Sequence, residues 1–595
     1  MATCVAAAGP APAAGTKVIA TIGPACQDVA TLTEMLTAGA VGARVDLTWG
    51  PLDFHRKSLS NLQAAMQGAR RLCCTIVDTL GREVMVRRKV HLDENGWPVH
   101  DGEFDIKAGQ TVTLTTRLDV ATSASVLPLT YDKFNEMAQK GDTIYVGRYL
   151  VSGADTASLY LEVQDVVGED VICLAKNDAL LTGLLTCFHV ERSQDSLANV
   201  QNAQPLLSDY DKEAFQILAR EHEIDFLSLS YVRTAEDVKE ARAYLASIGS
   251  PSTRILAKVE TRQALLNLSS ILAAADGIIM SRGNLGLDCA PEKMALIQKT
   301  LIQACNLVGK PVFITRVVDT MVDTPRPTRA EATDVANAVL DGADGVLLGA
   351  ETLRGKYAVD CVTTVCRIAR SAEAVFNHSD HFDFLWGAWR SPLLSKLEAI
   401  ASSAVRAAEK VGARLIMVYT HTGMSAALVA KYKPPVPVLS LVVPTLRSNG
   451  LRWTLEGRGF ARQSLLNRGV LPMLVSPSAQ GEEILEEAAV MASHMGLCSP
   501  QDQVVCVQRV HGEFCVKVRR NPSAGAAAAQ HAPPAGLPAC LLACHSTGVN
   551  ASPSIGPSLA RQSLSPLYEK LEQAPQAFVS VASMRLSSGM YVSEA

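Results

Sequence analysis

Short apolar runs bounded by polar residues recur along the first two thirds of the chain, and helix-like segments separate most of them. A run of this length flanked by turn residues is typical of a buried strand. Eight such runs lie at residues 17–23, 41–48, 72–79, 225–231, 254–260, 277–283, 310–316 and 345–351. The segments between them, such as residues 292–309, carry apolar residues at i, i+3 and i+4, the spacing of an amphipathic helix. Strands buried on both faces that alternate with helices predict a (β/α)8 TIM barrel.

The pattern changes between the third and fourth apolar runs. Apolar and polar residues alternate with a period of two in TVTLTTRL, DTIYVGRYLV and SLYLEVQDVV, and Gly and Asp separate these segments. Alternation of this kind is typical of half-buried strands. We therefore predict that residues 82–203 form a small β-barrel domain inserted into the TIM barrel, whose two parts are residues 16–81 and 204–375.

Strand and helix patterns alternate again after a predicted linker at residues 376–396. The runs RLIMVYT, VPVLSLVV, GVLPMLV and QVVCVQRV predict an open α/β domain over residues 397–520. The composition then changes to NPSAGAAAAQHAPPAG, which has too little apolar surface to bury. We expect residues 521–595 to be a disordered tail and residues 1–15 to be a flexible N-terminal segment.

Composition and charge exclude several classes of protein. A net charge of −4 gives no sign of a nucleic-acid partner, and no apolar run reaches the roughly 18–20 residues that span a bilayer. The first residues lack the pattern of a secretory signal. The 15 cysteines are dispersed through apolar runs, as in reduced intracellular proteins. We expect a cytoplasmic protein that binds neither nucleic acid nor membrane.

Polar residues gather where the predicted barrel strands end. In a barrel of this type the active site lies at the C-terminal ends of the strands. These ends carry Arg44, Asp46, Thr48, Asp78, Thr79, Lys258, Glu260, Arg282, Gly283, Asn284, Thr315, Arg316 and Glu351. A single charged residue at a strand end is more often solvated than catalytic, whereas so many strand ends of this kind indicate a functional site.

The types of residue indicate phosphate chemistry. Arg44 and Lys258 suit an anionic substrate, and Glu260 offers a hard oxygen ligand for Mg²⁺. Period-two alternation places Lys258 and Glu260 on the same side of their strand. Gly283 and Gly286 allow backbone N–H groups to approach an anion closely. Because the chain has neither a P-loop motif nor a Ser-His-Asp candidate, phosphoryl transfer by positioning and electrostatics is the remaining interpretation.

Several motifs resemble those of a known family over roughly residues 16–510. The most specific are TKVIATIGPA, LAKVET, SRGNLG, KPVFITR, PRPTRAEATDVANAVLDGAD and LLGAETLRGKY. On these motifs the chain is similar to the pyruvate kinase family, and its sequence is most similar to the plant-type cytosolic branch. The resemblance implies an enzyme that transfers the phosphoryl group of phosphoenolpyruvate to ADP, giving pyruvate and ATP in glycolysis. It also implies a homotetramer.

The resemblance further implies roles for single residues. Arg44 and Lys258 would act on the transferring phosphoryl group and the enolate, Thr315 would lie on the proton-donating side, and all three would contact substrate. The backbone N–H groups of Gly283 and Asn284 would hold the substrate carboxylate. Mg²⁺ or Mn²⁺ would bind Glu260 and residue 284. The K⁺ ligands would be Asp46, Thr48, Asp78 and Thr79, with Glu83 at a position that the family associates with K⁺ dependence.

Four departures from the family pattern bear on activity. RGN stands in place of RGD, so Asn284 replaces a carboxylate. In the segment DLTWG, Asp46 adds a carboxylate that the family pattern lacks. The negative charge lost at residue 284 and the one gained at residue 46 form a candidate compensating pair. Leu80 and Met85 replace a Lys and an Arg of the family pattern. Asn284, Leu80 and Met85 motivate an alternative function, a catalytically weak, metabolite-binding regulatory or heteromeric subunit of the same fold.

Overall fold

The computed structural model describes residues 14–94, 97–150, 157–193, 196–388, 395–449, 452–476, 482–510 and 513–521. Almost all of the predicted tail and of the predicted N-terminal segment therefore lies outside the described residues. Within the described ranges, no helix is both long and apolar enough to cross a membrane.

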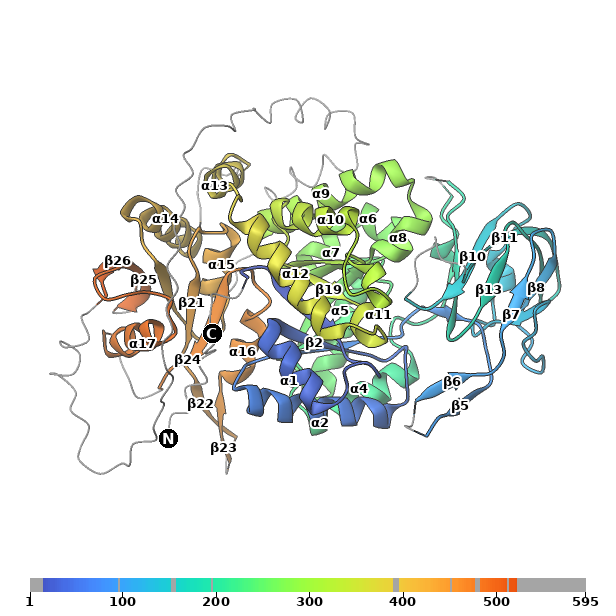
Figure 1. Cartoon of the computed structure of the whole chain (residues 1–595), viewed down its shortest axis with the longest axis horizontal. Helices are drawn as coiled ribbons and strands as arrows, with labels where there is room; N and C mark the ends of the chain where they lie inside the picture. Colours follow the sequence, from blue (N-terminus) through green and yellow to red (C-terminus); the bar gives the residue numbers. More distant parts are fainter. Residues whose placement is uncertain are drawn as a thin grey trace. The chain divides into compact units, whose positions relative to one another are not determined.

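Eight parallel strands form a closed barrel, in the order β1-β19-β18-β17-β16-β15-β3-β2. They are β1 (Lys17–Thr21), β2 (Ala40–Asp46), β3 (Cys74–Asp78), β15 (Phe226–Leu229), β16 (Arg254–Val259), β17 (Gly277–Met280), β18 (Val312–Thr315) and β19 (Gly345–Leu348). Each corresponds to one of the eight apolar runs, so the predicted TIM barrel is confirmed. Figure 1 shows the helices that surround these strands.

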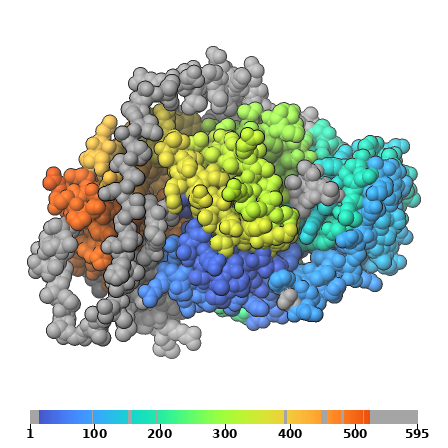
Figure 2. All heavy atoms as spheres, in the orientation of Figure 1, coloured from blue at the N-terminus to red at the C-terminus, as the bar shows by residue number. Residues whose placement is uncertain are grey.

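The larger barrel helices are α1 (Val29–Ala38), α2 (Leu52–Ala69), α4 (Asp209–Glu221), α5 (Ala235–Ser247), α9 (Pro291–Val308), α10 (Arg329–Leu340) and α12 (Ala358–Glu373). The first and the last of them lie side by side on the surface, blue next to yellow in Figure 2. Helix α1 follows β1, and α12 follows β19. The two helices meet because β1 pairs with β19 as well as with β2 and so closes the barrel.

Local sequence explains where these elements begin and end. The Asp28 side chain caps α1 by accepting a hydrogen bond from the backbone N–H of Thr31, and Gly309 ends α9 in the left-handed region. The interior of the barrel is filled by large side chains such as Ile76, Phe226 and Phe313.

The segment SRGNLG differs from the expectation that it ends the sixth strand. Strand β17 stops at Met280, Ser281 takes the N-cap position, and residues Arg282–Asp288 form the short helix α8. The segment therefore presents a helical first turn to the end of the barrel.

The inserted region forms a second, mainly antiparallel sheet, in the order β4-β14-β10-β11-β12-β8-β9. The strands are β4 (Val84–Met85), β8 (Thr111–Thr115), β9 (Val126–Pro128), β10 (Thr143–Arg148), β11 (Ser158–Val167), β12 (Asp170–Ala175) and β14 (Leu185–His189). A bridge between Val86 and Leu129 joins its two edges, and alternate side chains fill one core, as the period-two pattern predicts. Two small pairs, β5 (Val90–Leu92) with β6 (Pro98–His100) and β7 (Phe104–Ile106) with β13 (Ala179–Leu181), complete this region.

A third sheet has the order β24-β21-β20-β25-β26. It consists of β20 (Leu415–Thr420), β21 (Val438–Val442), β24 (Val470–Leu474), β25 (Gln503–Val510) and the antiparallel edge strand β26 (Glu513–Arg520). Helices α14 (Lys396–Val411) and α15 (Met424–Lys431) pack on one face and α17 (Glu482–His494) on the other. The open α/β arrangement predicted for this part of the chain is confirmed.

Two features of the C-terminal part, a helix and a hairpin, were not predicted. Helix α13 (His378–Gly387) occupies much of the predicted linker, and its Phe382 and Leu385, three residues apart, are buried in the core beneath α14. Strands β22 (Thr445–Asn449) and β23 (Arg452–Glu456) form a separate hairpin.

Helix α16 (Arg458–Ser464) contacts the barrel where β15 begins, at the end opposite to the predicted active site. Arg462 Nε lies 2.9 Å from Asp225 Oδ2, and their side chains are 4% and 1% exposed. Gln463 Nε2 donates to the carbonyl of Asp225 at 3.2 Å. The ammonium of Lys17, at the start of β1, donates to the carbonyl of Val470 at 2.8 Å.

We expect the substitution Arg462→Leu to lower the free energy of unfolding by about 3–5 kcal/mol, because it leaves the buried Asp225 without its cation. Urea unfolding of the full chain measures the change. The control is Arg458→Leu on the same helix, whose side chain is 51% exposed and lies 4.0 Å from Glu223. Loss of this exposed pair should cost less than about 1 kcal/mol. Equal losses in the two variants would contradict the expectation.

Candidate active site

The C-terminal ends of the barrel strands surround an open pocket of about 810 Å³. Its lining includes six of the predicted site residues: Arg44, Lys258, Glu260, Gly283, Asn284 and Thr315. The pocket also receives residues of the inserted region, among them Tyr145 and Tyr149.

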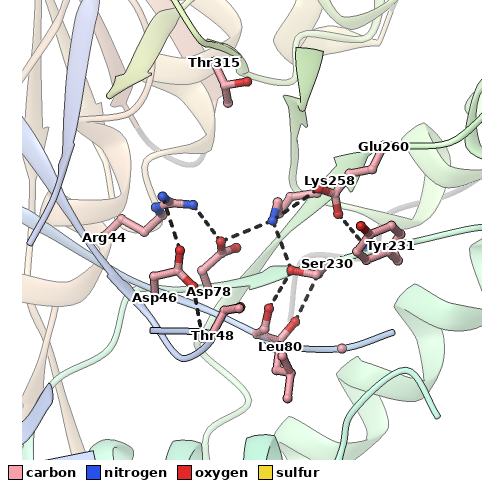
Figure 3. Close-up of polar contacts among 12 residues, drawn as sticks. Arg44, Asp46, Thr48, Asp78, Leu80, Ser230, Tyr231, Lys258, Glu260 and Thr315 are labelled. Carbon is pink, nitrogen blue, oxygen red and sulfur yellow. Dashed lines mark hydrogen bonds and ion pairs between the residues drawn. The ribbon is translucent and has the colours of Figure 1, made fainter. Parts of the chain in front are cut away.

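Two buried cations share one carboxylate at the base of this site (Figure 3). Arg44 Nη1 donates to Asp78 Oδ2 at 2.7 Å, and Lys258 Nζ lies 3.3 Å from the same oxygen. Burial disfavours the charged ammonium of Lys258, but Asp78 and Glu260 outweigh burial and raise the pKa of Lys258 above its ordinary value. The pKa of Arg44 is raised in the same way against burial, by Asp46 and Asp78. Both side chains are therefore positively charged at neutral pH.

Ser230 also holds Lys258, at the end of the fourth barrel strand. Its hydroxyl accepts from Lys258 Nζ at 3.1 Å and donates to the carbonyl of Thr79 at 2.6 Å. The backbone N–H of Ser230 donates to the hydroxyl of Thr79 at 3.0 Å. The ammonium is thus fixed by neighbouring strands, with little freedom to leave the site.

Asp46 lies on the other side of Arg44, and its carboxylate has three neighbours. Oδ2 accepts from the Tyr149 hydroxyl at 2.8 Å and lies 3.4 Å from Arg44 Nη2, while Oδ1 accepts from the backbone N–H of Thr48 at 3.1 Å. Burial and Asp46 raise the pKa of Tyr149 well above its ordinary value, so this phenol remains a donor. The predicted K⁺ ligands Asp46, Thr48, Asp78 and Thr79 thus lie on β2, on β3 or immediately after them.

Glu260 and Asn284 form a second group around Tyr231. Glu260 Oε2 accepts from the backbone N–H of Tyr231 at 2.7 Å, and Oε1 lies 3.4 Å from Lys258 Nζ. Asn284 Nδ2 donates to Tyr231 Oη at 3.0 Å and to Glu260 Oε1 at 3.3 Å. The amide nitrogen of Asn284 therefore faces both groups.

Glu83 lines the same pocket. Burial, followed by the charge of Glu260, raises the pKa of Glu83 to about 8. Two carboxyl groups in one buried pocket repel each other when both are ionised, and a bound cation would relieve that repulsion.

Thr315 and Gly283 line another part of the pocket. The Thr315 hydroxyl accepts from the backbone N–H of Arg282 at 3.2 Å and donates to the carbonyl of Met280 at 3.1 Å. Figure 3 shows Thr315 apart from the network of Arg44, Asp78 and Lys258. A Cβ atom on Gly283 would lie 3.1 Å from Arg316 Nε, so glycine leaves room for that guanidinium.

Arg282 is a structural cation. Its guanidinium lies 2.6 Å from Asp334, donates to the carbonyl of Thr315 at 2.7 Å and bonds the carbonyl of Arg316. These contacts hold the start of α8 against the end of β18. Arg82 is likewise engaged, in an ion pair with Asp237 at 2.7 Å.

Sequence reasoning missed Ser230, Tyr231 and Tyr149. The first two end the fourth apolar run, DFLSLSY, and the same strand-end argument that selected Lys258 could have selected them. Tyr149 lies near the end of an alternating run of the inserted region, and it is 103 residues from Asp46 along the chain, so the sequence gives no signal of their contact.

The site fits metal ions that use few protein ligands. Within the described ranges, no group of three or more His, Cys, Asp or Glu residues is arranged to hold a metal. Mg²⁺ needs only one or two carboxylates beside water and substrate oxygens, and Glu260 with the Asn284 carbonyl meets that requirement. Asp78 Oδ1 is buried and makes no hydrogen bond to the described part of the chain, so an acceptor is left for a monovalent cation.

Family models match most of the chain. The model described as "Pyruvate kinase, barrel domain" matches residues 13–362, and the one described as "Pyruvate kinase, alpha/beta domain" matches residues 398–514. The chain belongs to the pyruvate kinase family. The resemblance found in the motifs is therefore confirmed.

Relatives of known function support membership in the plant-type cytosolic branch of pyruvate kinases. The chain is 44% identical over 515 residues to "Pyruvate kinase 2, cytosolic" of Oryza sativa subsp. indica, covering 84% of this chain and 94% of that protein. It is 36% identical over 510 residues to "Pyruvate kinase, cytosolic isozyme" of Glycine max, covering 84% and 95%. A crystal structure of Cryptosporidium parvum pyruvate kinase has a TM-score of 0.73 at 28% identity, covering 86% of this chain and 98% of that one.

The function is accordingly that of a pyruvate kinase, a phosphotransferase of glycolysis whose substrates are phosphoenolpyruvate and ADP. Members of this family depend on metal ions, in agreement with the ligands available around Glu260 and Asp78.

Proposed function

We propose that Arg44 and Lys258 carry the phosphoryl transfer. Arg44 Nη2 is buried, lies beside Asp46 and makes no hydrogen bond to the described residues, so a donor is left for a phosphoryl oxygen. Lys258 stabilises the charge that develops on the phosphoryl group and on the enolate oxygen, a preorganised electrostatic role. The observation that carries this proposal is the shared Asp78 carboxylate, which holds both cations at one point of the pocket.

Binding and protonation of the substrate are assigned to the other wall of the pocket. The N–H groups of Gly283 and Asn284 lie in the first turn of α8. Backbone N–H groups in the first turn of a helix have no acceptor within the helix, so these two hold the substrate carboxylate. Thr315 lies on the side from which the enolate carbon receives its proton, and its hydroxyl orients the proton donor there.

We assign Glu260 and Asn284 to Mg²⁺ or Mn²⁺, and Asp46, Thr48, Asp78 and Thr79 to K⁺. When bound, the divalent ion supplies charge neutralisation for substrate oxygens. The buried carboxylates and the unpartnered Asp78 oxygen support this assignment. We further propose a homotetramer in the cytoplasm, supported by family membership and by relatives named cytosolic. Analytical ultracentrifugation tests the assembly.

An assay coupled to lactate dehydrogenase, with phosphoenolpyruvate, ADP, Mg²⁺ and K⁺, tests the assigned function directly. Turnover well above that of a Lys258→Met control supports the active enzyme. Turnover no higher than that control would favour the alternative, a metabolite-binding regulatory or heteromeric subunit.

The compensating pair of charges gives a further prediction. Asn284→Asp places a carboxylate beside Glu260, so we expect Mg²⁺ to bind about tenfold more tightly because a divalent ion then meets two charged ligands. Asp46→Asn removes a carboxylate from the K⁺ ligands, and we expect the K⁺ constant to rise severalfold. Titration of each ion in the coupled assay measures both constants. If neither variant changes either constant, the two charges do not compensate.

A further inference from the structure

Tyr231 occupies a strained position at the edge of the site. It follows Ser230 at the end of the fourth barrel strand, and its backbone φ is 52°, in the left-handed region. For a bulky side chain this conformation is a genuine outlier, and such strain persists only where the surroundings determine it. Its side chain and backbone are nearly fully buried, at 8% exposure.

Contacts around Tyr231 hold its backbone in this conformation. Its N–H donates to Glu260 Oε2 at 2.7 Å, and its carbonyl accepts from Arg82 Nη1 at 2.9 Å. Its ring packs with Tyr145 and Phe188 of the inserted region. The strained backbone therefore places one side chain between the barrel end and the inserted sheet.

The phenol of Tyr231 holds the amide of Asn284. Its oxygen accepts from Asn284 Nδ2 at 3.0 Å. A phenol oxygen can accept a hydrogen bond whichever way its own proton points, so it can hold the NH₂ group of the amide.

An amide ligand needs such a partner, whereas a carboxylate does not. The two oxygens of a carboxylate are equivalent, but an amide presents either an oxygen or an NH₂ group, and only the oxygen binds a cation. Glu260 Oε1 also accepts from the amide, but a cation bound to Glu260 competes for that oxygen. The Tyr231 phenol is the contact that remains to orient the amide.

We propose that Tyr231 is a positioning residue for the divalent cation: its hydroxyl holds the Asn284 NH₂ group and so turns the amide carbonyl toward the ion. This inference rests on the proposed assignment of Glu260 and Asn284 as ligands. It explains how this chain binds a divalent ion with an amide in place of the second carboxylate of the family pattern.

A double-mutant cycle tests the link, with binding of Mn²⁺ alone to the full chain measured by electron paramagnetic resonance of the free ion. We expect Tyr231→Phe to weaken Mn²⁺ binding about fivefold to tenfold in the native background, in line with the loss of an outer-shell partner. In the Asn284→Asp background the same change should alter binding less than about twofold, because a carboxylate needs no orienting donor. In the coupled assay, Tyr231→Phe should raise the Mg²⁺ constant, and added Mg²⁺ should restore part of the lost turnover.

Tyr244→Phe is the matched control, since the Tyr244 hydroxyl donates to the carbonyl of Lys212 at 2.6 Å outside the pocket. It should leave Mn²⁺ binding unchanged. Thermal melting without metal verifies that each variant is folded, and Tyr231→Leu, which also lacks the hydroxyl, replaces Tyr231→Phe if the latter does not fold. Native Mn²⁺ affinity in the folded Tyr231 variant overturns the inference, and so does an equal loss in both backgrounds.

The same titration separates this inference from the proposed metal site. If Glu260→Gln weakens Mn²⁺ binding while the Tyr231 variant does not, the site stands and the positioning role fails. If Glu260→Gln leaves Mn²⁺ binding unchanged, the assignment of the site itself fails.

Discussion

We expect Lys258→Met to lower kcat for pyruvate formation by about 10³-fold, which corresponds to roughly 4 kcal/mol of lost transition-state stabilisation. Methionine keeps most of the length of the side chain but removes the charge that Asp78 and Glu260 hold in place. The charge is needed most when the phosphoryl group leaves and the enolate oxygen becomes negative. The effect should therefore appear in kcat more than in KM for phosphoenolpyruvate.

Loss of a buried ammonium also destabilises the barrel, so a matched control is needed. Lys17 is likewise a buried lysine on a barrel strand, but it lies at the opposite end and donates to the carbonyl of Val470. Lys17→Met should lower the melting temperature and retain near-native kcat. If Lys258→Met, folded by circular dichroism, keeps kcat within about tenfold of the native value, Lys258 does not carry the charge stabilisation that we assign to it.

The barrel and the positions of its polar strand ends could be predicted because both depend on local pattern. Each apolar run is long enough for one buried strand, and parallel strands of a barrel bring residues such as Arg44 and Lys258 to the same end. Distance along the chain does not matter to that argument. The same pattern selected Glu260 and Thr315, which line the pocket.

Other features depend on contacts that no local pattern encodes. The Tyr149 hydroxyl reaches Asp46 from a different sheet, and alternation shows only which face of its strand is apolar, not which surface it meets. The positive φ of Tyr231 is equally hidden, because an aromatic residue gives no signal of a left-handed backbone. The helical start at Arg282 was missed because two glycines in six residues suggest a turn.

Asn284 shows how the structure changes the meaning of a substitution. In the sequence it is only the loss of a carboxylate. In the structure its amide nitrogen is held by Tyr231 and Glu260, so the carbonyl is available to a cation. The charge of the proposed divalent site then depends on Glu260.

We expect Glu260→Gln to weaken Mn²⁺ binding by about 100-fold, because the site then keeps two neutral amides and no assigned carboxylate. Glutamine preserves the shape and can still accept the backbone N–H of Tyr231, which Glu260 Oε2 accepts at 2.7 Å. The lost charge therefore accounts for the change. At fixed Mg²⁺, kcat/KM for phosphoenolpyruvate should fall by about 10³-fold and recover in part as Mg²⁺ is raised.

The control for Glu260→Gln is Glu398→Gln, a buried glutamate of the C-terminal part that pairs with Lys431 at 2.7 Å. It should lower stability through the loss of that pair while leaving the Mn²⁺ constant unchanged. Free Mn²⁺ is measured by electron paramagnetic resonance for both variants under the same K⁺ concentration. A Glu260→Gln protein that binds Mn²⁺ as tightly as the native chain would show that the divalent ion is held elsewhere, because its one assigned carboxylate would then contribute no affinity.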